Sequence, residues 1–122
     1  MDGGTRTLED VIRELDGGLR ELYGRRHRGL VLYGSHARRE ADEGSDVDLL
    51  LLLEGQVQIG REIRRSSDLV ASLSLESGCV LSLIPVNVED YRYSSEPYLV
   101  NARREGVSFP SAESTDALER RL

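Results

Sequence analysis

Two aspartates with one residue between them stand at the head of a leucine-rich run. Asp46 and Asp48 lead directly into residues 49–53, which are all leucine. Because side chains alternate between the two faces of a β-strand, a strand starting at Asp46 would place both carboxylates on one face, with Cα atoms roughly 6–7 Å apart. Such a pair needs a cation, an arginine or water. Mg²⁺ commonly binds through one or two carboxylates together with substrate phosphates.

A glycine–serine pair lies upstream of the aspartates. Gly34 and Ser35 follow the short apolar run 30–33, and ten residues separate Ser35 from Asp46. Glycine allows close approach of the backbone, and Ser35 can cap a short helix expected over residues 36–40. Free N–H groups at a turn from strand to helix bind phosphate. If the two flanking strands are neighbours, a phosphate site would lie beside a metal site.

Neither piece is specific by itself. A lone D-x-D pair is common, and most exposed carboxylate pairs are solvated surface. The full order of strand, glycine–serine, ten-residue spacer, D-x-D and second strand is much harder to obtain by chance.

The combined pattern resembles the nucleotidyltransferase superfamily related to DNA polymerase beta, and within it the minimal nucleotidyltransferase (MNT) domains of prokaryotes. Their signature reads approximately G-S-x-A-R-G-x-A, a spacer and S-D-x-D-L, and residues 34–41 and 45–49 match it. Arg39 replaces a usual glycine, and His36 stands where arginine is frequent. The similarity continues through residues 89–91, 97–99 and 101–107.

The resemblance implies Mg²⁺-dependent transfer of a nucleoside monophosphate, most simply AMP from ATP, to an acceptor hydroxyl. It implies that Asp46 and Asp48 are catalytic and bind the metal. It also implies nucleotide contacts from Gly34, Ser35, Arg38 and Ser45. Family members often work with a small helical HEPN protein as a toxin–antitoxin pair, in which the MNT protein can adenylylate a tyrosine of the toxin. A HEPN-type protein is therefore the expected partner. Arg38 is read equally as a phosphate contact and as a surface residue.

One part of the family's site is missing from the sequence. Family members carry a third carboxylate on a neighbouring strand, expected here at residues 79–86, and this segment has no acidic residue. Its central polar residue, Ser82, is expected at the third-acid position. Losing a general base typically costs about 10²–10⁴-fold in rate. Two readings stay open: an active nucleotidyltransferase, or a catalytically weak or inactive nucleotide-binding module that acts by binding a partner protein.

Composition narrows the other possibilities. The chain has 122 residues, which suits one domain, and its net charge of −6 argues against non-specific binding of nucleic acid. Its single cysteine, Cys79, excludes an intrachain disulfide. With no signal peptide and no apolar run near eighteen residues, a cytoplasmic protein is expected. His27 lies in an arginine-rich connector and is expected to be solvated. An antibiotic nucleotidyltransferase is a further alternative, although those proteins usually need an extra domain for the drug pocket.

Periodicity predicts how these residues are positioned. Long helices are expected from Leu8 to Tyr23 and from Ile59 to about Ser77, and a last helix over 97–104. Strands are expected at 30–33, 46–53 and 79–86, with a turn or short helix at 87–91 and a short edge strand at 107–109. Together these give an α/β (α+β) domain with a small mixed β-sheet packed with helices, the nucleotidyltransferase fold. The domain is expected over 1–110 with a polar tail over 111–122, and exposed sheet edges are compatible with a homodimer.

Overall fold

A mixed β-sheet forms the centre of the molecule. In the computed structural model, residues 7–42 and 44–109 are described. Within them the four-stranded sheet has the order β3-β2-β1-β4. Strand β1 is antiparallel to β2 and to β4, whereas β2 and β3 are parallel. The strands are β1 (His27–Tyr33), β2 (Val47–Leu53), β3 (Leu81–Asn87) and β4 (Val107–Phe109).

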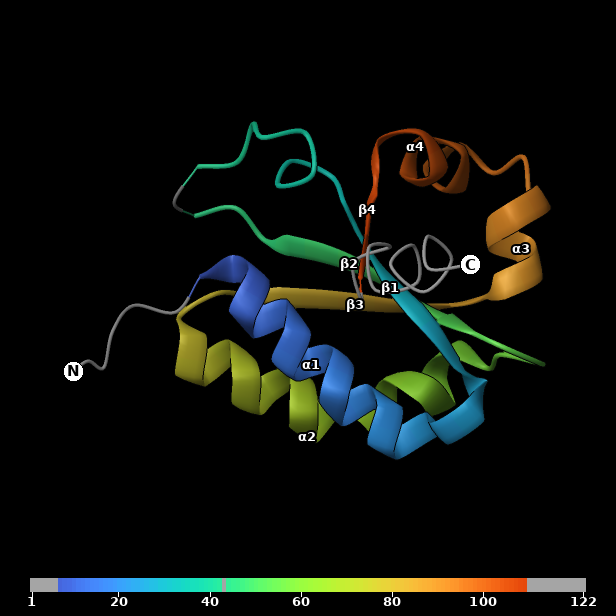
Figure 1. Ribbon diagram of the computed structural model, residues 1–122, viewed down its shortest axis with the longest axis horizontal. Helices are drawn as coiled ribbons and strands as arrows, with labels where there is room; N and C mark the ends of the chain where they lie inside the picture. The colour runs from blue at the N-terminus through green and yellow to red at the C-terminus, as the bar shows by residue number, and fades with distance from the viewer. Residues whose placement is uncertain (1–6, 43, 110–122) are drawn as a thin grey trace, which may run out of the picture.

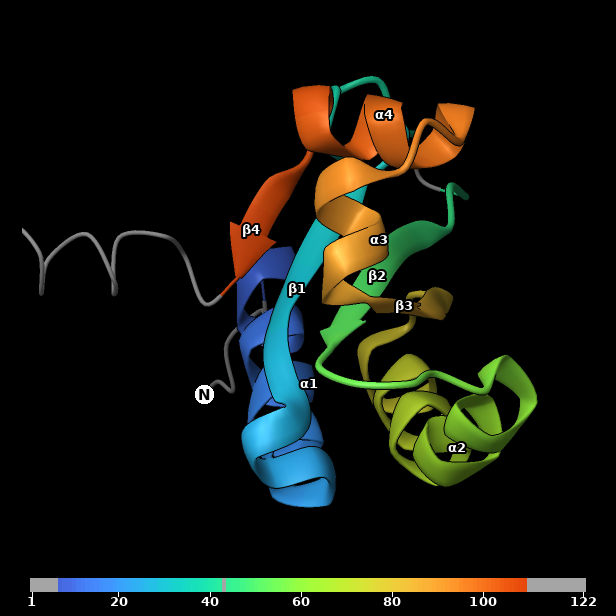
Figure 2. The ribbon, with the colours of Figure 1, turned by 90° about the vertical axis from the view of Figure 1, so that its right-hand side faces the viewer.

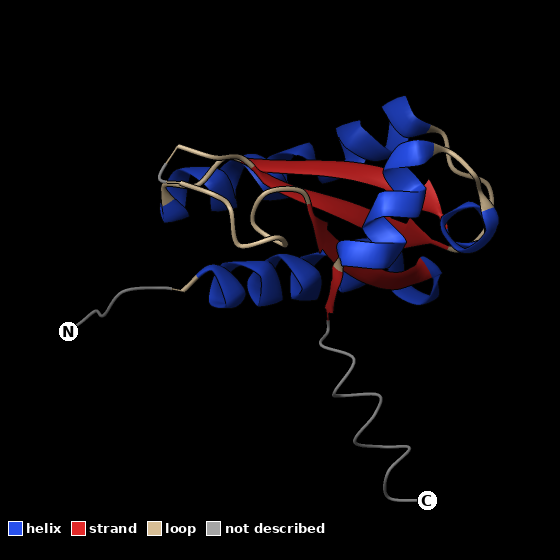
Figure 3. Cartoon of the chain, turned by 90° about the horizontal axis from the view of Figure 1, so that it is seen from above, coloured by secondary structure: helices blue, strands red, loops and turns tan. Residues whose placement is uncertain are grey.

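Helices cover both faces of the sheet. The long helices α1 (Leu8–Tyr23) and α2 (Ile59–Ser77) lie on one face, and the short helices α3 (Val88–Tyr93) and α4 (Pro97–Glu105) lie on the other (Figures 1 and 3). A 3₁₀ turn, η1 (Gly24–Arg26), joins α1 to β1. Strand β4 is a short edge beside β1, as Figure 2 shows. The expected mixed sheet packed with helices is confirmed. The predicted tail, 111–122, lies outside the described residues.

The leucine run of β2 is buried on both faces, as its continuous apolar character predicts. Leu49, Leu51 and Leu53 pack into the core beneath α1 and α2. Leu50 and Leu52 pack into the smaller core beneath α3 and α4. The strand that carries Asp48 is therefore fixed by packing from two sides.

Local signals explain the start and the end of α1. Thr7 and Asp10 form a capping box, in which each side chain accepts a hydrogen bond from the other residue's backbone N–H. Gly24 ends the helix at a φ of 56°, a conformation that glycine adopts easily. The predicted bounds of α1 are confirmed.

Residues 36–40 form hydrogen-bonded turns and not the predicted short helix. The N–H of Arg38 donates to the Gly34 carbonyl and that of Glu40 to the Ser35 carbonyl. Arg39 has a φ of 61°, and a non-glycine residue in this left-handed region interrupts a right-handed helix. The strand predicted from Asp46 also begins one residue later, at Val47, and β3 begins at Leu81, two residues later than predicted.

His27 is buried, and the expectation that it is solvated is wrong. Its side chain is 0% exposed and its Nε2 lies 2.9 Å from Oδ1 of Asp16. Burial by itself would raise the pKa of Asp16, but hydrogen bonding with His27 and Arg20 outweighs it and holds this pKa below its ordinary value. The imidazole therefore serves to join α1 to the start of β1.

Glu62 is a second buried acid at the same end of the sheet. It is 2% exposed, its backbone carbonyl accepts from the Tyr23 hydroxyl, and its carboxylate lies 3.7 Å from the Arg26 guanidinium. This arrangement ties α2 to the end of α1. No helix among the described residues is long and apolar enough to span a membrane.

Candidate functional site

Strand register brings three side chains into one row across the sheet. Tyr33 of β1 pairs with Asp48 of β2, and Asp48 pairs with Ser82 of β3. Paired residues of neighbouring strands point to the same face, here the face that carries α3 and α4. The structure thus places Ser82 next to Asp48, where the third acid was expected. That Ser82 takes this role remains a prediction.

The backbone of Gly34 lies directly against the Asp48 carboxylate. A Cβ at this position would be 2.6 Å from Oδ2 of Asp48, and Gly34 has a φ of 78°. Both the space and the backbone conformation therefore require glycine. The expected proximity of the glycine–serine turn and the aspartates is present in the geometry.

The turn after Gly34 presents free backbone donors. Among the described residues, the N–H groups of Ser35, His36 and Ala37 donate to no protein acceptor, whereas those of Arg38 and Glu40 close the turn. Successive unpaired N–H groups form a concave site that attracts anions. The turn beside Asp48 can therefore bind phosphate without the helix that the sequence predicted.

The two aspartates repel one another. Asp46 is exposed and Asp48 is half-buried. Burial and the Asp46 charge raise the pKa of Asp48, while His36 and Arg38 oppose this shift. A divalent cation between the carboxylates would remove the repulsion. In the described part of the chain no third His, Cys, Asp or Glu joins them in a metal-binding group. Two carboxylates suit Mg²⁺, whose other ligands are usually phosphate oxygens and water.

Arg38 is held beside this site by two acids. Its Nε donates to Oε1 of Glu40 at 2.9 Å, and a terminal nitrogen lies 3.7 Å from Oε1 of Glu105 on α4. The bond to Glu40 raises the pKa of Arg38 above its ordinary value, so the guanidinium stays charged. Arg38 lines a cavity of about 210 Å³, together with Tyr33, Gly34 and Glu105.

Ser45 shapes the loop before the aspartates. Its hydroxyl donates to Oδ1 of Asp42 and accepts from the Asp42 backbone N–H, both at 3.0 Å. The Ser45 carbonyl lies 3.3 Å from Nε2 of His36. These contacts connect the two ends of the connection between β1 and β2. A direct nucleotide contact by Ser45 stays a prediction and would have to replace one of these bonds.

Sequence reasoning missed two tyrosines at the site. Tyr33 lies beside Asp48, and burial followed by the charge of Asp48 raises the pKa of this tyrosine. Tyr98 lines the cavity next to Gly34 and also a second cavity at the end of β3. The position of Tyr33 directly before Gly34 was the only available signal, because its pairing with Asp48 depends on register.

Comparisons with known proteins agree with this geometry. The family model described as nucleotidyltransferase domain matches residues 12–102. A crystal structure described as a toxin-antitoxin with AMP-PNP superposes with a TM-score of 0.59 at 18% identity, covering 92% of this chain and 80% of that chain. No curated protein matches the chain significantly.

Two further similar structures are mutants of the toxin-antitoxin MntA-HpeT. One superposes with a TM-score of 0.57 at 18% identity, covering 93% of this chain and 80% of that chain. The other has a TM-score of 0.52 at 14% identity, with 84% and 78% covered. These structures show a shared fold. Because the family model spans more than half of the sequence, including both aspartates and the glycine–serine turn, the chain belongs to the nucleotidyltransferase domain family.

Proposed function

We propose that this protein is a Mg²⁺-dependent nucleotidyltransferase that transfers AMP from ATP to an acceptor hydroxyl. The expected acceptor is a tyrosine of a HEPN-type partner, with this chain as the antitoxin of a toxin–antitoxin pair. The observation that carries the proposal is the contact between the Gly34 backbone and the Asp48 carboxylate, which joins a phosphate-binding turn to a pair of metal-binding acids. The fold shared with toxin–antitoxin structures, one of them described with AMP-PNP, supports the choice of nucleotide and partner.

Each group has a defined task in this reaction. The free N–H groups of the turn after Gly34 bind the triphosphate, and the Arg38 guanidinium offsets its negative charge. Asp46 and Asp48 hold the metal. When bound, Mg²⁺ supplies charge stabilisation and orients the α-phosphate.

The transfer itself is an in-line displacement. The acceptor oxygen forms a bond to the α-phosphorus while the bond from that phosphorus to the bridging oxygen breaks, and pyrophosphate leaves with the electron pair. The acceptor proton passes to water, because Ser82 is a weak base at neutral pH. The row of side chains therefore favours binding and orientation of the substrates over rapid proton removal.

Labelled nucleotide tests the proposal. With ATP labelled at the α-phosphate, Mg²⁺ and a HEPN-type protein, the wild type should transfer label to that protein. The double variant Asp46→Asn/Asp48→Asn should lose this transfer while its folding is unchanged. Glu89→Gln, which removes one exposed carboxylate of α3, serves as the control and should keep full activity. Undiminished labelling by the double variant would refute the mechanism.

Ser82 favours a second candidate function, a partner-binding module with weak or no catalysis. In the register of β3 it occupies the position next to Asp48, and a hydroxyl cannot replace a carboxylate as a base. Neutralisation of the toxin by the Asp46→Asn/Asp48→Asn variant separates the two functions. If the variant still forms the complex and neutralises the toxin, occupancy is sufficient. If it binds but fails to neutralise, transfer is required.

A further inference from the structure

This inference rests on the proposed function. If the chain transfers a nucleotide, the order of the strands fixes the side from which the acceptor approaches. The turn proposed to bind phosphate follows β1, Asp48 lies on β2 with Asp46 directly before the strand, and Ser82 lies on β3. In an in-line displacement the attacking oxygen lies opposite the leaving group. With pyrophosphate leaving over the Gly34–Ser35 turn, the acceptor hydroxyl must come from the side of β3.

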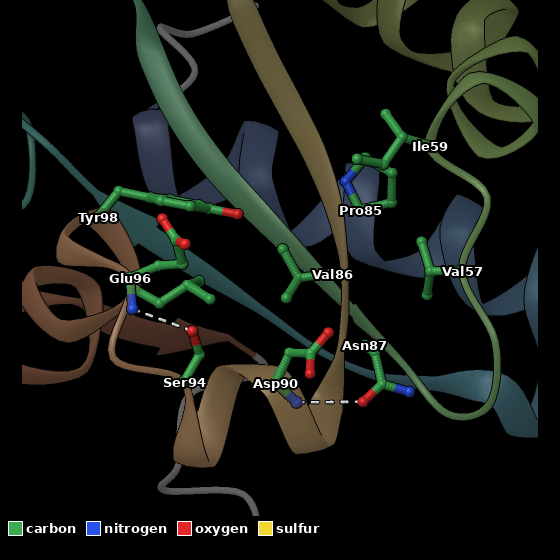
Figure 4. Close-up of a pocket in the computed structure, with 10 residues that line it drawn as sticks. Val57, Ile59, Pro85, Val86, Asn87, Asp90, Ser94, Glu96 and Tyr98 are labelled. Atoms are coloured by element: carbon green, nitrogen blue, oxygen red, sulfur yellow. Dashed lines mark hydrogen bonds between the residues drawn. The ribbon is translucent and has the colours of Figure 1, made fainter.

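A cavity lies along that approach. On β3, Ser82, Ile84 and Val86 share the face of Asp48, because alternate residues of a strand point to the same side. Val86 is one wall of a cavity of about 190 Å³ between the end of β3 and the segment that joins α3 to α4 (Figure 4). By the rise per residue of a strand, Val86 lies roughly 13 Å from Ser82.

The cavity combines aliphatic walls with two carboxylates. Its apolar lining comes from Val57, Ile59, Pro85, Val86 and Leu99, and its acids are Asp90 and Glu96. Figure 4 shows both acids facing the same hollow as Tyr98. No arginine among residues 7–42 and 44–109 lines this cavity, so the two carboxylates make its electrostatic potential negative and would repel a nucleotide phosphate.

Within the described part of the chain, these two carboxylates differ from neighbouring acids in having no cationic partner. Glu89 pairs with Arg92, and Glu105 pairs with Arg38. Among the described residues, the side chains of Asp90 and Glu96 take part in no hydrogen bond or ion pair found in the structure. Their charge is therefore available to a group from outside the chain.

Hydrogen bonds fix the backbone of the segments that carry the two acids, whose side chains are exposed. The Asn87 side-chain oxygen accepts from the N–H groups of Glu89 and Asp90, and its amide nitrogen donates to the Gly55 carbonyl at 2.6 Å. The Ser94 hydroxyl accepts from the Glu96 N–H at 3.0 Å. Because the rim is fixed by these bonds, the cavity exists before any partner binds.

We propose that this cavity binds a basic side chain, arginine or lysine, of the acceptor protein and thereby selects the acceptor. The aliphatic stem of such a side chain matches the walls from Val86 and Leu99, and its charged head reaches Asp90 and Glu96. The cavity wall at Val86 lies roughly 13 Å along β3 from Ser82, which is the span of four residues in an extended segment of the acceptor. Asp90 and Glu96 are specificity-determining residues in this arrangement.

Short peptides test the cavity without relying on catalysis. The probe is a capped peptide with arginine and tyrosine separated by three glycines, prepared in both orders and titrated into isotope-labelled full-length protein. The matched peptide carries neutral citrulline in place of arginine. Backbone amide signals of Asp90, Glu96 and Tyr98 should shift with the arginine peptide and not with the citrulline peptide.

Variants of the rim complete the test. Asp90→Asn/Glu96→Gln should raise the dissociation constant of the arginine peptide about tenfold or more, while Glu89→Gln, which alters a neighbouring acid outside the cavity, should leave it unchanged. Shifts elsewhere, equal binding of both peptides, or equal weakening by Glu89→Gln would overturn the proposal. Loss of AMP transfer to every acceptor with intact peptide binding would refute the proposed function alone. Intact transfer with no arginine-dependent binding would refute the cavity alone.

Discussion

The acidic side chains at the two ends of the sheet have opposite electrostatic surroundings. At the end where β1 begins, each buried acid faces a cation, since Asp16 contacts His27 and Arg20 and Glu62 lies near Arg26. At the end where β1 finishes, the largest influence on the pKa of Asp48 after burial is the negative charge of another acid, Asp46. The first set joins elements of the fold. The second is left short of positive charge, as expected of acids that receive a metal from outside.

Removing one acid from each end of the sheet should give the largest difference in effect. Asp48→Asn should lower AMP transfer about 10³-fold, since a bound metal contributes several kcal/mol to the transition state, and should leave the protein equally or more stable. Asp16→Asn should lower stability by about 2 kcal/mol because it removes the negative charge that contacts His27 and Arg20, with little change in activity per folded molecule.

Chemical unfolding and the labelled-AMP assay on the same preparations check both outcomes. An unstable Asp48→Asn protein, or an inactive but stable Asp16→Asn protein, would contradict the assignment of stability to one end of the sheet and of activity to the other.

A carboxylate introduced in place of Ser82 should increase both the transfer rate and the affinity of the site for Mg²⁺. Ser82→Asp places a third acid beside Asp48, and where proton removal limits the rate, transfer should rise by up to about 10²-fold. Apparent affinity for Mg²⁺ should rise with it. The control is Ser67→Asp, the same change on the exposed surface of α2. Steady-state rates across a Mg²⁺ titration measure both effects, and equal behaviour of the two variants would exclude Ser82 from the reacting centre.

Substituting alanine for two glycines should give a smaller difference, in activity at one position and in stability at the other. In Gly34→Ala the new methyl group would meet the Asp48 carboxylate, so transfer should fall about tenfold or more through displaced binding groups. Gly17→Ala in α1 adds a methyl group with no atom within 4 Å and should stabilise the protein by about 0.5–1 kcal/mol. Thermal unfolding and AMP transfer on both variants test this pair, and a fully active Gly34→Ala protein would contradict the close approach.

The pH dependence of stability gives the smallest effect. The pKa of Asp16 is lowered in the folded protein, so its contribution to stability is present above the ordinary value of 3.8 and is lost as the pH falls through the lower folded value. The pKa of Asp48 is raised, so ionising it costs stability as the pH rises through its folded value.

Urea unfolding at pH 7 and at pH 3 separates these two signs. The stability difference between wild type and Asp16→Asn should shrink at the lower pH. The corresponding difference for Asp48→Asn should be small and of opposite sign at pH 7. A difference for Asp16→Asn that does not change with pH would mean that its ionised form is not what the fold uses.

Much of the fold was predictable because its signals are local. The apolar stripe and capping box of α1 and the leucine run of β2 each depend on neighbours in sequence. The glycine–serine and D-x-D pairs could also be recognised in the sequence, because their spacing is fixed along the chain. What is not local was missed: the row of Tyr33, Asp48 and Ser82 depends on strand register, and register is decided by contacts between distant segments.

Two local errors have physical causes as well. The arginines around His27 suggested an exposed connector, but its partner Asp16 lies eleven residues away on α1, and only the packed fold reveals the pair. The turn at residues 36–40 carries helix-compatible residues, yet Arg39 adopts a left-handed conformation that sequence alone does not indicate.

The position of Tyr33 has a consequence for self-modification. An enzyme that adenylylates tyrosine hydroxyls carries a hazard in any tyrosine of its own beside the reacting phosphate. Tyr33 lies in register with Asp48, and burial together with that carboxylate raises the pKa of its phenol. A phenol with a raised pKa ionises less readily than an ordinary tyrosine, so Tyr33 is the weaker nucleophile. Under the proposed function, the Asp48 charge that is available to a metal also disfavours ionisation of the tyrosine beside it.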